Sequence, residues 1–164
     1  MESHLNEGST FYFEVPLAAT RAKARPSQPA APPLSALPPG LRILVAEDNP
    51  VNRKVIVMML SQAGALVEIA ENGRIAYERH QASPYDVILM DCQMPEMDGY
   101  QATASIRSLP GNASLVPIIG VTANAFAEDR DRCLRAGMNG YVAKPLSRET
   151  LIAALSQLIP APAL

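Results

Sequence analysis

Five short apolar runs that alternate with longer amphipathic stretches constrain the fold of this chain more than any other feature. The runs have the length and composition of β-strands, and the stretches between them have those of helices. The strand-like runs are LRILVA (41–46), LVEIA (66–70), DVILM (86–90), VPIIGV (116–121) and YVA (141–143). The helix-like stretches cover about 50–63, 73–82, 99–108, 127–136 and 147–159. Five strands, each followed by a helix, predict an α/β domain with an open parallel sheet and helices on both faces.

Capping residues support these helix boundaries. Asn49 precedes a proline, which is a typical helix start, and Asp98 and Ser147 are further candidates for N-caps. Gly64 and Gly137 stand where the first and fourth helices should end. The run LVEIA is more polar at its centre than the other strands, so we expect it near an edge of the sheet.

The residues before this region have a different composition. Residues 10–17, TFYFEVPL, alternate apolar and less apolar positions, which predicts a strand. No partner for it follows, so we interpret residues 1–17 as an orphan strand at the end of another domain. Residues 18–40 hold seven Ala and six Pro and predict an extended linker. The folded domain should therefore cover 41–159, with 160–164 as a tail.

Polar side chains follow four of the five predicted strands. Glu47 and Asp48 come after the first strand, Asp91 after the third, Thr122 after the fourth and Lys144 after the fifth. The carboxyl ends of parallel strands lie at one edge of a sheet, where open α/β sheets bind their ligands. Taken singly, each of these residues is more often a cap, a turn residue or a solvated lysine. Their convergence at one edge predicts a site.

The charges in this site predict a metal and a phosphoryl group. Three crowded carboxylates resist ionisation unless a cation neutralises them. Mg²⁺ suits the site because it takes few protein carboxylates, keeps several waters and binds phosphate oxygens. The ammonium of Lys144 and the hydroxyl of Thr122 can both donate to a phosphate oxygen. An acyl phosphate formed on a carboxylate fits this set of groups.

Composition excludes several other classes of function. The net charge of −2 gives no basic surface for nucleic acid. Cys92 and Cys133 lie far apart and match no metal spacing, so we interpret them as free thiols in a reducing cytosol. The sequence has no apolar run long enough to span a membrane, and its polar start does not resemble a signal peptide. We therefore expect this fragment to be cytoplasmic and to make no membrane contact.

Four motifs resemble those of response-regulator receiver domains from two-component phosphorelays. They are AEDN at 46–49, LMDCQMPEMDG at 89–99, VTANA at 121–125 and GYVAKP at 140–145. The resemblance covers residues 41–159 and implies a flavodoxin-like sheet with strand order 2-1-3-4-5. It also implies that Asp91 is the phosphoacceptor. Glu47, Asp48, Asp91 and the backbone carbonyl of Gln93 resemble the Mg²⁺ site of the family.

The same resemblance assigns roles to residues around the acceptor. Thr122 is similar to the switch hydroxyl of the family, and Ala123 to the small residue that leaves the phosphoryl site open. Lys144 is similar to the lysine that pairs with the phosphoryl group, and its bond to Pro145 to a cis peptide. Tyr141 resembles an aromatic residue that changes rotamer on phosphorylation, although an amphipathic strand residue would look alike.

Residues 8–17 resemble the end of the ATP-binding domain of sensor histidine kinases. This implies that the parent protein is a hybrid histidine kinase whose catalytic core precedes Met1. Such a parent kinase can be anchored in the inner membrane. The expected partners are that kinase core and a histidine phosphotransfer protein or domain. Since the chain ends at PAPAL (160–164), we do not expect a self-contained transcription factor.

Three other functional classes on this fold fit the site residues less well than a phosphorelay receiver does. A degenerate receiver would act only as an interaction module, but all five site residues are retained. An aspartyl-phosphate phosphatase would need a second acid after the nucleophile, and only Glu96 and Asp98 are near. A flavin carrier would need a phosphate loop rich in Ser, Thr and Gly after the first strand, where EDNPVNR stands instead.

The first helix predicts a docking surface. Its run VIVMML (55–60) is too long to face the sheet entirely, because an α-helix turns by about 100° per residue. We expect Val57 and Met58 to point outward and to help bind the partner. The residues expected to face the sheet are Val55, Ile56, Met59, Leu60 and Ala63.

Overall fold

The computed structural model describes residues 2–4, 8–10, 37–123 and 127–159. The chain divides into two compact units, residues 1–31 and 32–164. In the first unit, β1 (Glu2–His4) pairs with β2 (Gly8–Thr10) in an antiparallel register. The strand expected over 10–17 lies outside the described residues apart from Thr10. The described end of that segment does have a partner strand, which precedes it in the chain.

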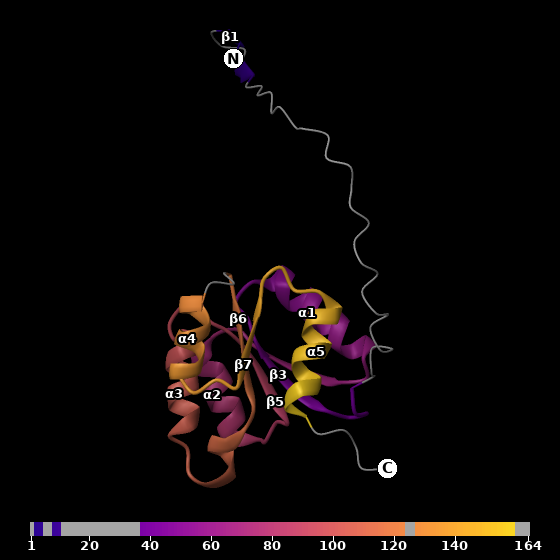
Figure 1. Ribbon diagram of the computed structural model, residues 1–164, viewed down its shortest axis with the longest axis vertical. Helices are drawn as coiled ribbons and strands as arrows, with labels where there is room; N and C mark the ends of the chain where they lie inside the picture. The colour runs from indigo at the N-terminus through magenta and orange to yellow at the C-terminus, as the bar shows by residue number, and fades with distance from the viewer. Residues whose placement is uncertain (1, 5–7, 11–36, 124–126, 160–164) are drawn as a thin grey trace. The chain divides into compact units, whose positions relative to one another are not determined.

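The second unit is a five-stranded parallel sheet of order β4-β3-β5-β6-β7 with helices on both faces (Figure 1). The strands are β3 (Arg42–Ala46), β4 (Leu66–Ala70), β5 (Val87–Asp91), β6 (Ile118–Thr122) and β7 (Gly140–Ala143). The helices are α1 (Pro50–Gln62), α2 (Gly73–Ala82), α3 (Gly99–Arg107), α4 (Ala127–Arg135) and α5 (Arg148–Leu158), with a 3₁₀-helix η1 (Gly111–Leu115). This order in sequence numbering is 2-1-3-4-5, so the expected fold is confirmed, with β4 at an edge.

Two apolar cores lie on opposite faces of the sheet. Alternate residues of each strand enter different cores, as the pleat requires: Ile43 packs with α1 and α5, whereas Leu44 packs with α2 and α3. Figure 1 shows α1 and α5 on one side of the strands and α2, α3 and α4 on the other. No described helix has both the length and the apolar content that a membrane crossing needs.

Local hydrogen bonds explain why the helices begin where they do. The side chain of Asn49 accepts from the amide of Val51 at the start of α1. Asp98 and Ser147 form capping boxes at the starts of α3 and α5. At their other ends, α1 and α4 stop at Gly64 and Gly137, whose positive φ angles of 91° and 96° favour glycine. These caps orient the loops that follow β3 and β5.

The folded unit begins before residue 41. Leu37, which the sequence analysis placed in the linker, is 3% exposed and belongs to the core between the sheet, α1 and α5. The amide of Leu41 bonds to the carbonyl of Pro38, and that of Gly40 to the carbonyl of Gly64. The high proline content therefore concealed a turn that buries one leucine.

Candidate functional site

The five polar residues predicted from the strand ends lie at one edge of the sheet. Glu47 and Asp48 directly follow β3, Asp91 and Thr122 are the last residues of β5 and β6, and Lys144 directly follows β7. Hydrogen bonds between neighbouring strands hold this edge together, for example from the Lys144 amide to the Thr122 carbonyl at 2.7 Å. Glu47, Asp91 and Thr122 are buried, whereas Asp48 is exposed.

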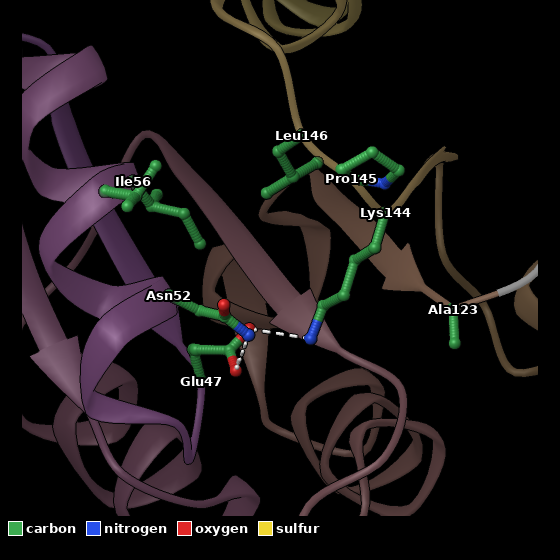
Figure 2. A pocket seen from close by; sticks show the side chains of 8 residues that line it. Glu47, Asn52, Ile56, Ala123, Lys144, Pro145 and Leu146 are labelled. Atoms are coloured by element: carbon green, nitrogen blue, oxygen red, sulfur yellow. Dashed lines mark hydrogen bonds and ion pairs between the residues drawn. The ribbon is translucent and has the colours of Figure 1, made fainter. Parts of the chain in front are cut away.

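Lys144 joins two of the carboxylates. Its Nζ lies 2.6 Å from Oδ2 of Asp91 and 2.8 Å from Oε2 of Glu47. Figure 2 shows the Lys144 side chain reaching from the end of β7 toward Glu47. The other oxygen of Asp91 accepts from the amide of Gln93 at 3.1 Å. One ammonium therefore faces two buried carboxylates across the ends of three strands.

These contacts shift the ionisation of all three groups. Burial raises the pKa of Asp91, and the bonds from Lys144 and the Gln93 amide only partly oppose it. Burial would also raise the pKa of Glu47, but hydrogen bonds from Lys144 and Asn52 outweigh it and lower the pKa. For Lys144, burial is outweighed by the bonds to Asp91 and Glu47, so its pKa is raised. The site thus holds a charged lysine beside an aspartate whose negative charge is costly.

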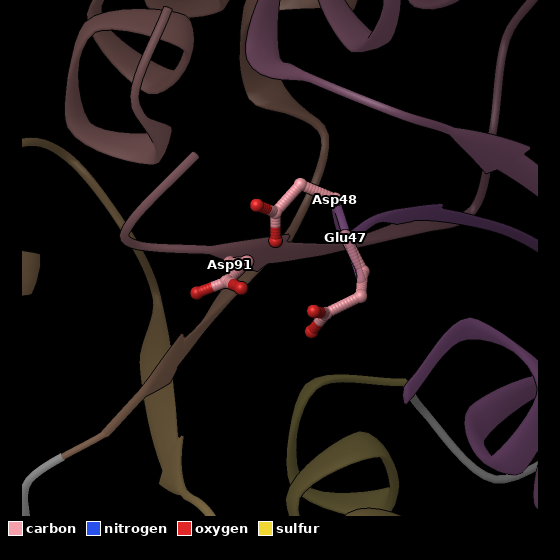
Figure 3. Close-up of side chains that lie close together, drawn as sticks. All are labelled: Glu47, Asp48 and Asp91. Carbon is pink, nitrogen blue, oxygen red and sulfur yellow. The ribbon is translucent and has the colours of Figure 1, made fainter. Parts of the chain in front are cut away.

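Three carboxylates form a cluster suited to a divalent cation. One oxygen each from Glu47, Asp48 and Asp91 lies within 4.8 Å of the others. Figure 3 shows the Asp48 and Asp91 side chains extending to the same side of the strand ends. Three negative charges against the one positive charge of Lys144 leave an excess of two, which a dication would balance. Hard oxygen donors of this kind fit Mg²⁺.

Asn52 is a site residue that the sequence analysis missed. Its Nδ2 donates to Oε1 of Glu47 at 3.0 Å, and the amide of Asn49 donates to the same oxygen at 3.3 Å. Asn52 is the third residue of α1, and its side chain points to Glu47 (Figure 2). In the sequence, the only sign of this role is that Asn52 follows the Glu47–Asp48 pair and falls in the first turn of a helix capped by Asn49. It fixes Glu47 in the orientation that meets Lys144.

Two adjoining cavities open at this edge. One of about 440 Å³ is lined by polar groups that include Asp48, Asp91, Gln93 and Lys144. The other, of about 430 Å³, is more apolar and is lined by Val55 and Ile56 of α1 and by Leu146 (Figure 2). Ala123 borders both cavities, and its short side chain leaves them open. The bond between Lys144 and Pro145 is cis.

Gly99 explains how the backbone at Asp91 approaches α3. A Cβ atom at Gly99 would collide with the carbonyl oxygen of Asp91 and lie 2.9 Å from Cγ of Met90. The Gly99 amide also bonds to the carbonyl of Cys92 at 3.3 Å. The glycine of the MDG sequence therefore lets the first turn of α3 press directly on the strand that carries Asp91.

Comparison with known proteins agrees with this geometry. The chain matches the family model of the response regulator receiver domain over residues 43–156. The chain belongs to the response regulator receiver family. It is 38% identical over 158 residues to the sensor protein EvgS of Escherichia coli K12, covering 96% of this chain and 13% of EvgS. It is 41% identical over 111 residues to the signal transduction histidine-protein kinase BarA of the same strain, covering 68% of this chain and 12% of BarA.

Solved structures of receivers are also similar to this domain. The receiver domain of the sensor histidine kinase PA1611 from Pseudomonas aeruginosa PAO1 is 47% identical, with a TM-score of 0.68. The match covers 73% of this chain and 97% of that domain, which has a magnesium ion coordinated in its active site cleft. Vibrio cholerae CheY4 is 28% identical with a TM-score of 0.69, over 73% of this chain and 99% of CheY4. The resemblance to receivers of hybrid kinases is therefore confirmed.

The remaining predicted residues lie around the receiver site. Tyr141 is on the edge strand β7, where it is partly buried and packs toward the core beneath α4. On α1, Met58 is exposed and Val57 is partly exposed, and both line a cavity of about 520 Å³ with Ile69. The assignment of Val55 to the sheet-facing side is wrong: Val55 is 37% exposed, since it sits at the border of the buried face.

The two cysteines of the receiver are free but adjacent. Their sulfur atoms are 3.6 Å apart, and both side chains are buried. The hydrogen bond between them and burial raise the pKa of Cys92, while the same bond lowers that of Cys133 to about 7. Spacing along the sequence could not show this contact, because it joins the end of β5 to α4 across β6.

Proposed function

We propose that this receiver domain takes a phosphoryl group from a phosphohistidine onto Asp91 and relays it to a histidine phosphotransfer partner. The contact that supports this most directly is the 2.6 Å bond from Lys144 to Asp91 beside two further carboxylates. A structural aspartate does not need two acidic neighbours at a strand end. An aspartate that carries a phosphoryl group needs a cation and a lysine close by.

The transfer proposed here uses few protein groups. An oxygen of Asp91 attacks phosphorus, the bond from phosphorus to the donor imidazole nitrogen breaks, and the imidazole leaves with that electron pair. Mg²⁺, held by Glu47, Asp48, Asp91 and the Gln93 carbonyl, would neutralise charge on the phosphoryl oxygens. Lys144 supplies the remaining positive charge, and its contact with Asp91 places it there before transfer. Glu47 keeps Lys144 aligned from the other side.

Two further residues are proposed to report the phosphorylated state. Thr122 is buried at the end of β6, adjacent in the sheet to β7, and its hydroxyl would donate to a phosphoryl oxygen. Tyr141 lies on β7, opposite Gly120 of β6. A shift of Thr122 toward the phosphoryl group would alter the space that Tyr141 occupies.

The donor and the location are part of the same proposal. EvgS and BarA are by name a sensor protein and a histidine-protein kinase, and the chain spans about an eighth of either. We propose that a kinase core in the same parent chain supplies the phosphoryl group, in the cytoplasm. The match to EvgS covers 96% of the chain and so includes much of the segment before the receiver, which supports the interpretation of residues 1–17.

The partner is proposed to dock on α1. This helix starts at Pro50, which lines the polar cavity, so a protein seated on α1 could bring a histidine to Asp91. Val57 and Met58 lie on its accessible side, and the exposed Val51 and Val55 extend the apolar surface toward the site. Positions 51, 55 and 58 share one side of a helix by their spacing.

Intact mass after incubation with acetyl phosphate and Mg²⁺ tests the acceptor. The receiver should gain the mass of one phosphoryl group, and Asp91→Asn should gain none. Asp131→Asn, an exposed aspartate on α4, is the matched control and should react like the parent. Equal labelling of Asp91→Asn would contradict the proposal. An unreactive parent would leave the chain as an interaction module without phosphoryl chemistry.

A further inference from the structure

The pair Cys92 and Cys133 has no role in the phosphoryl chemistry proposed above. Their sulfur atoms lie 3.6 Å apart, which is van der Waals contact. Cys92 is the first residue after β5, and Cys133 lies in the last turn of α4, so the pair joins the acceptor strand to a helix on one face of the sheet. The two side chains are 2% and 0% exposed.

A glycine in the strand between them makes room for the pair. A Cβ atom at Gly120 of β6 would lie 3.0 Å from the sulfur of Cys133 and 3.4 Å from that of Cys92. It would also lie 2.7 Å from the sulfur of Met138. Glycine inside a strand weakens the strand, and it often marks a close approach by another group. Here the missing side chain at Gly120 leaves space on β6 for the sulfur atoms of Cys92, Cys133 and Met138.

Cys92 is within reach of a small polar molecule. It lines a cavity of about 410 Å³ together with Asp98, Tyr100 and Arg132. The guanidinium of Arg132 stacks over the Tyr100 ring at 4.1 Å and forms part of the wall. This cavity also contacts Asp48, so it opens beside the proposed phosphorylation site. Cys133 is not among the residues that line it.

We propose that hydrogen peroxide entering this cavity converts Cys92 and Cys133 into an intrachain disulfide. Cys92 reacts first because it is the one of the two cysteines that lines the cavity. Its sulfur attacks one peroxide oxygen while the thiol proton passes to the other oxygen, the O–O bond breaks, and that oxygen leaves as water. The Cys133 sulfur then attacks the sulfenic sulfur of Cys92, the S–O bond breaks, and a second water leaves with the Cys133 proton. Each sulfur loses one electron, and peroxide gains both. A thiol reductant reverses the change.

The disulfide would couple redox state to phosphorylation, and this part rests on the proposed function. The new bond ties the residue after Asp91 to α4, the helix that follows the Thr122 loop. If phosphorylation shifts Thr122 and displaces α4, the disulfide between Cys92 and Cys133 would oppose that movement. We expect oxidation to slow phosphorylation of Asp91 by about fivefold or more, the lower end of typical coupling between two sites.

Peroxide titration followed by intact mass and non-reducing peptide mapping tests the disulfide. The chain should lose about two hydrogen masses with a crosslink between the two cysteine peptides, and dithiothreitol should restore both. Cys133→Ser, which keeps the size of the side chain, should form no crosslink. The exposed Met58 serves as an internal gauge of oxidant, since its sulfoxide adds mass instead.

The results divide cleanly between the two proposals. Two thiols that remain free after Met58 is fully oxidised would overturn the disulfide, as would sulfinic acid at Cys92 or a crosslinked dimer. Asp91→Asn should still form the disulfide, so a failure of phosphoryl chemistry does not affect this readout. Equal phosphorylation rates of oxidised and reduced receiver would overturn the coupling. In Cys92→Ser, which lacks the thiol that peroxide attacks, peroxide should leave the rate unchanged.

Discussion

At the scale of single residues, the receiver site is a balance of charge around Asp91. Lys144 contacts two of three clustered carboxylates, so the protein groups alone carry an excess of negative charge. Burial raises the pKa of Asp91, and the nearby Glu47 carboxylate adds a smaller contribution in the same direction. A cation that joins Asp48 and Asp91 would remove the penalty. The contacts that place Asp91 would therefore also favour binding of a dication.

Magnesium should accordingly stabilise the folded receiver. A ligand at about 100 times its dissociation constant contributes about 2.7 kcal/mol to the free energy of unfolding. We expect Mg²⁺ to raise the midpoint of thermal unfolding of the parent. Asp48→Ala should lose most of that increase, since Asp48 is the exposed carboxylate of the cluster and has the least structural role. Asp131→Asn should respond like the parent, and an equal response of Asp48→Ala would contradict the metal site.

The site residues could be predicted from sequence to the extent that strand ends reveal them. Asp91, Lys144 and Glu47 each terminate a recognisable apolar run, and parallel strands bring such ends together. Asn52 and the contact between Cys92 and Cys133 could not be predicted in this way. Both depend on which helix face meets which strand, and hydrophobic pattern does not determine side-chain contacts between distant segments.

At the scale of elements, local sequence signals predicted the helices and strands of the receiver but not the 3₁₀-helix η1. Gly111–Leu115 has no apolar periodicity, and tertiary bonds hold it in place. Arg107 of α3 donates to the carbonyls of Ser114 and Val116, and Nε2 of His80 lies 2.8 Å from the carbonyl of Ala113. By contrast, α1 and α5 each begin at a cap visible in the sequence. An element stabilised by distant side chains leaves little trace in its own residues.

Helix α1 carries the prediction about docking. The double variant Val57→Ser and Met58→Gln should transfer its phosphoryl group to a phosphotransfer partner about tenfold more slowly. The reason is that the lost interface contacts contribute about 1–2 kcal/mol of binding free energy, and about 1.4 kcal/mol corresponds to a factor of ten. Phosphorylation by acetyl phosphate should stay normal, since neither side chain lines the cavities at Asp91. Rapid-quench measurement of transfer would check both rates.

Leu134→Ser on α4 is the matched control for that experiment, because it also removes an exposed apolar side chain from a helix. Its transfer rate should equal that of the parent. A double variant on α1 that transfers at the parental rate would show that the partner seats elsewhere. Loss of acetyl phosphate reactivity would instead indicate damage to the site itself.

At the scale of the whole molecule, the alternating pattern predicted five βα units but could not order them. Strand order depends on long-range pairing, and several orders satisfy right-handed crossovers between parallel strands. The order 2-1-3-4-5 came from the resemblance of four motifs and is confirmed by the pairing of β3 with both β4 and β5. The start of the folded unit was missed for a different reason. Two prolines and a glycine after Leu37 look like linker, although they form the turn that buries it.

Leu37 therefore sets where the receiver can be shortened without loss. A chain that starts at Pro32 keeps Leu37, and its free energy of unfolding should match that of the full chain. A chain that starts at Leu41 loses a leucine that is 3% exposed, which should cost about 1.5–3 kcal/mol of unfolding free energy.

Leu37→Ala in the full chain should show a loss of similar size, whereas Leu66→Ala, 61% exposed on β4, should show little. Denaturant unfolding of all five proteins checks this. Equal stability of the two shortened chains would mean that Leu37 contributes nothing, and a large loss on removing residues 1–31 would mean that the amino-terminal unit stabilises the receiver.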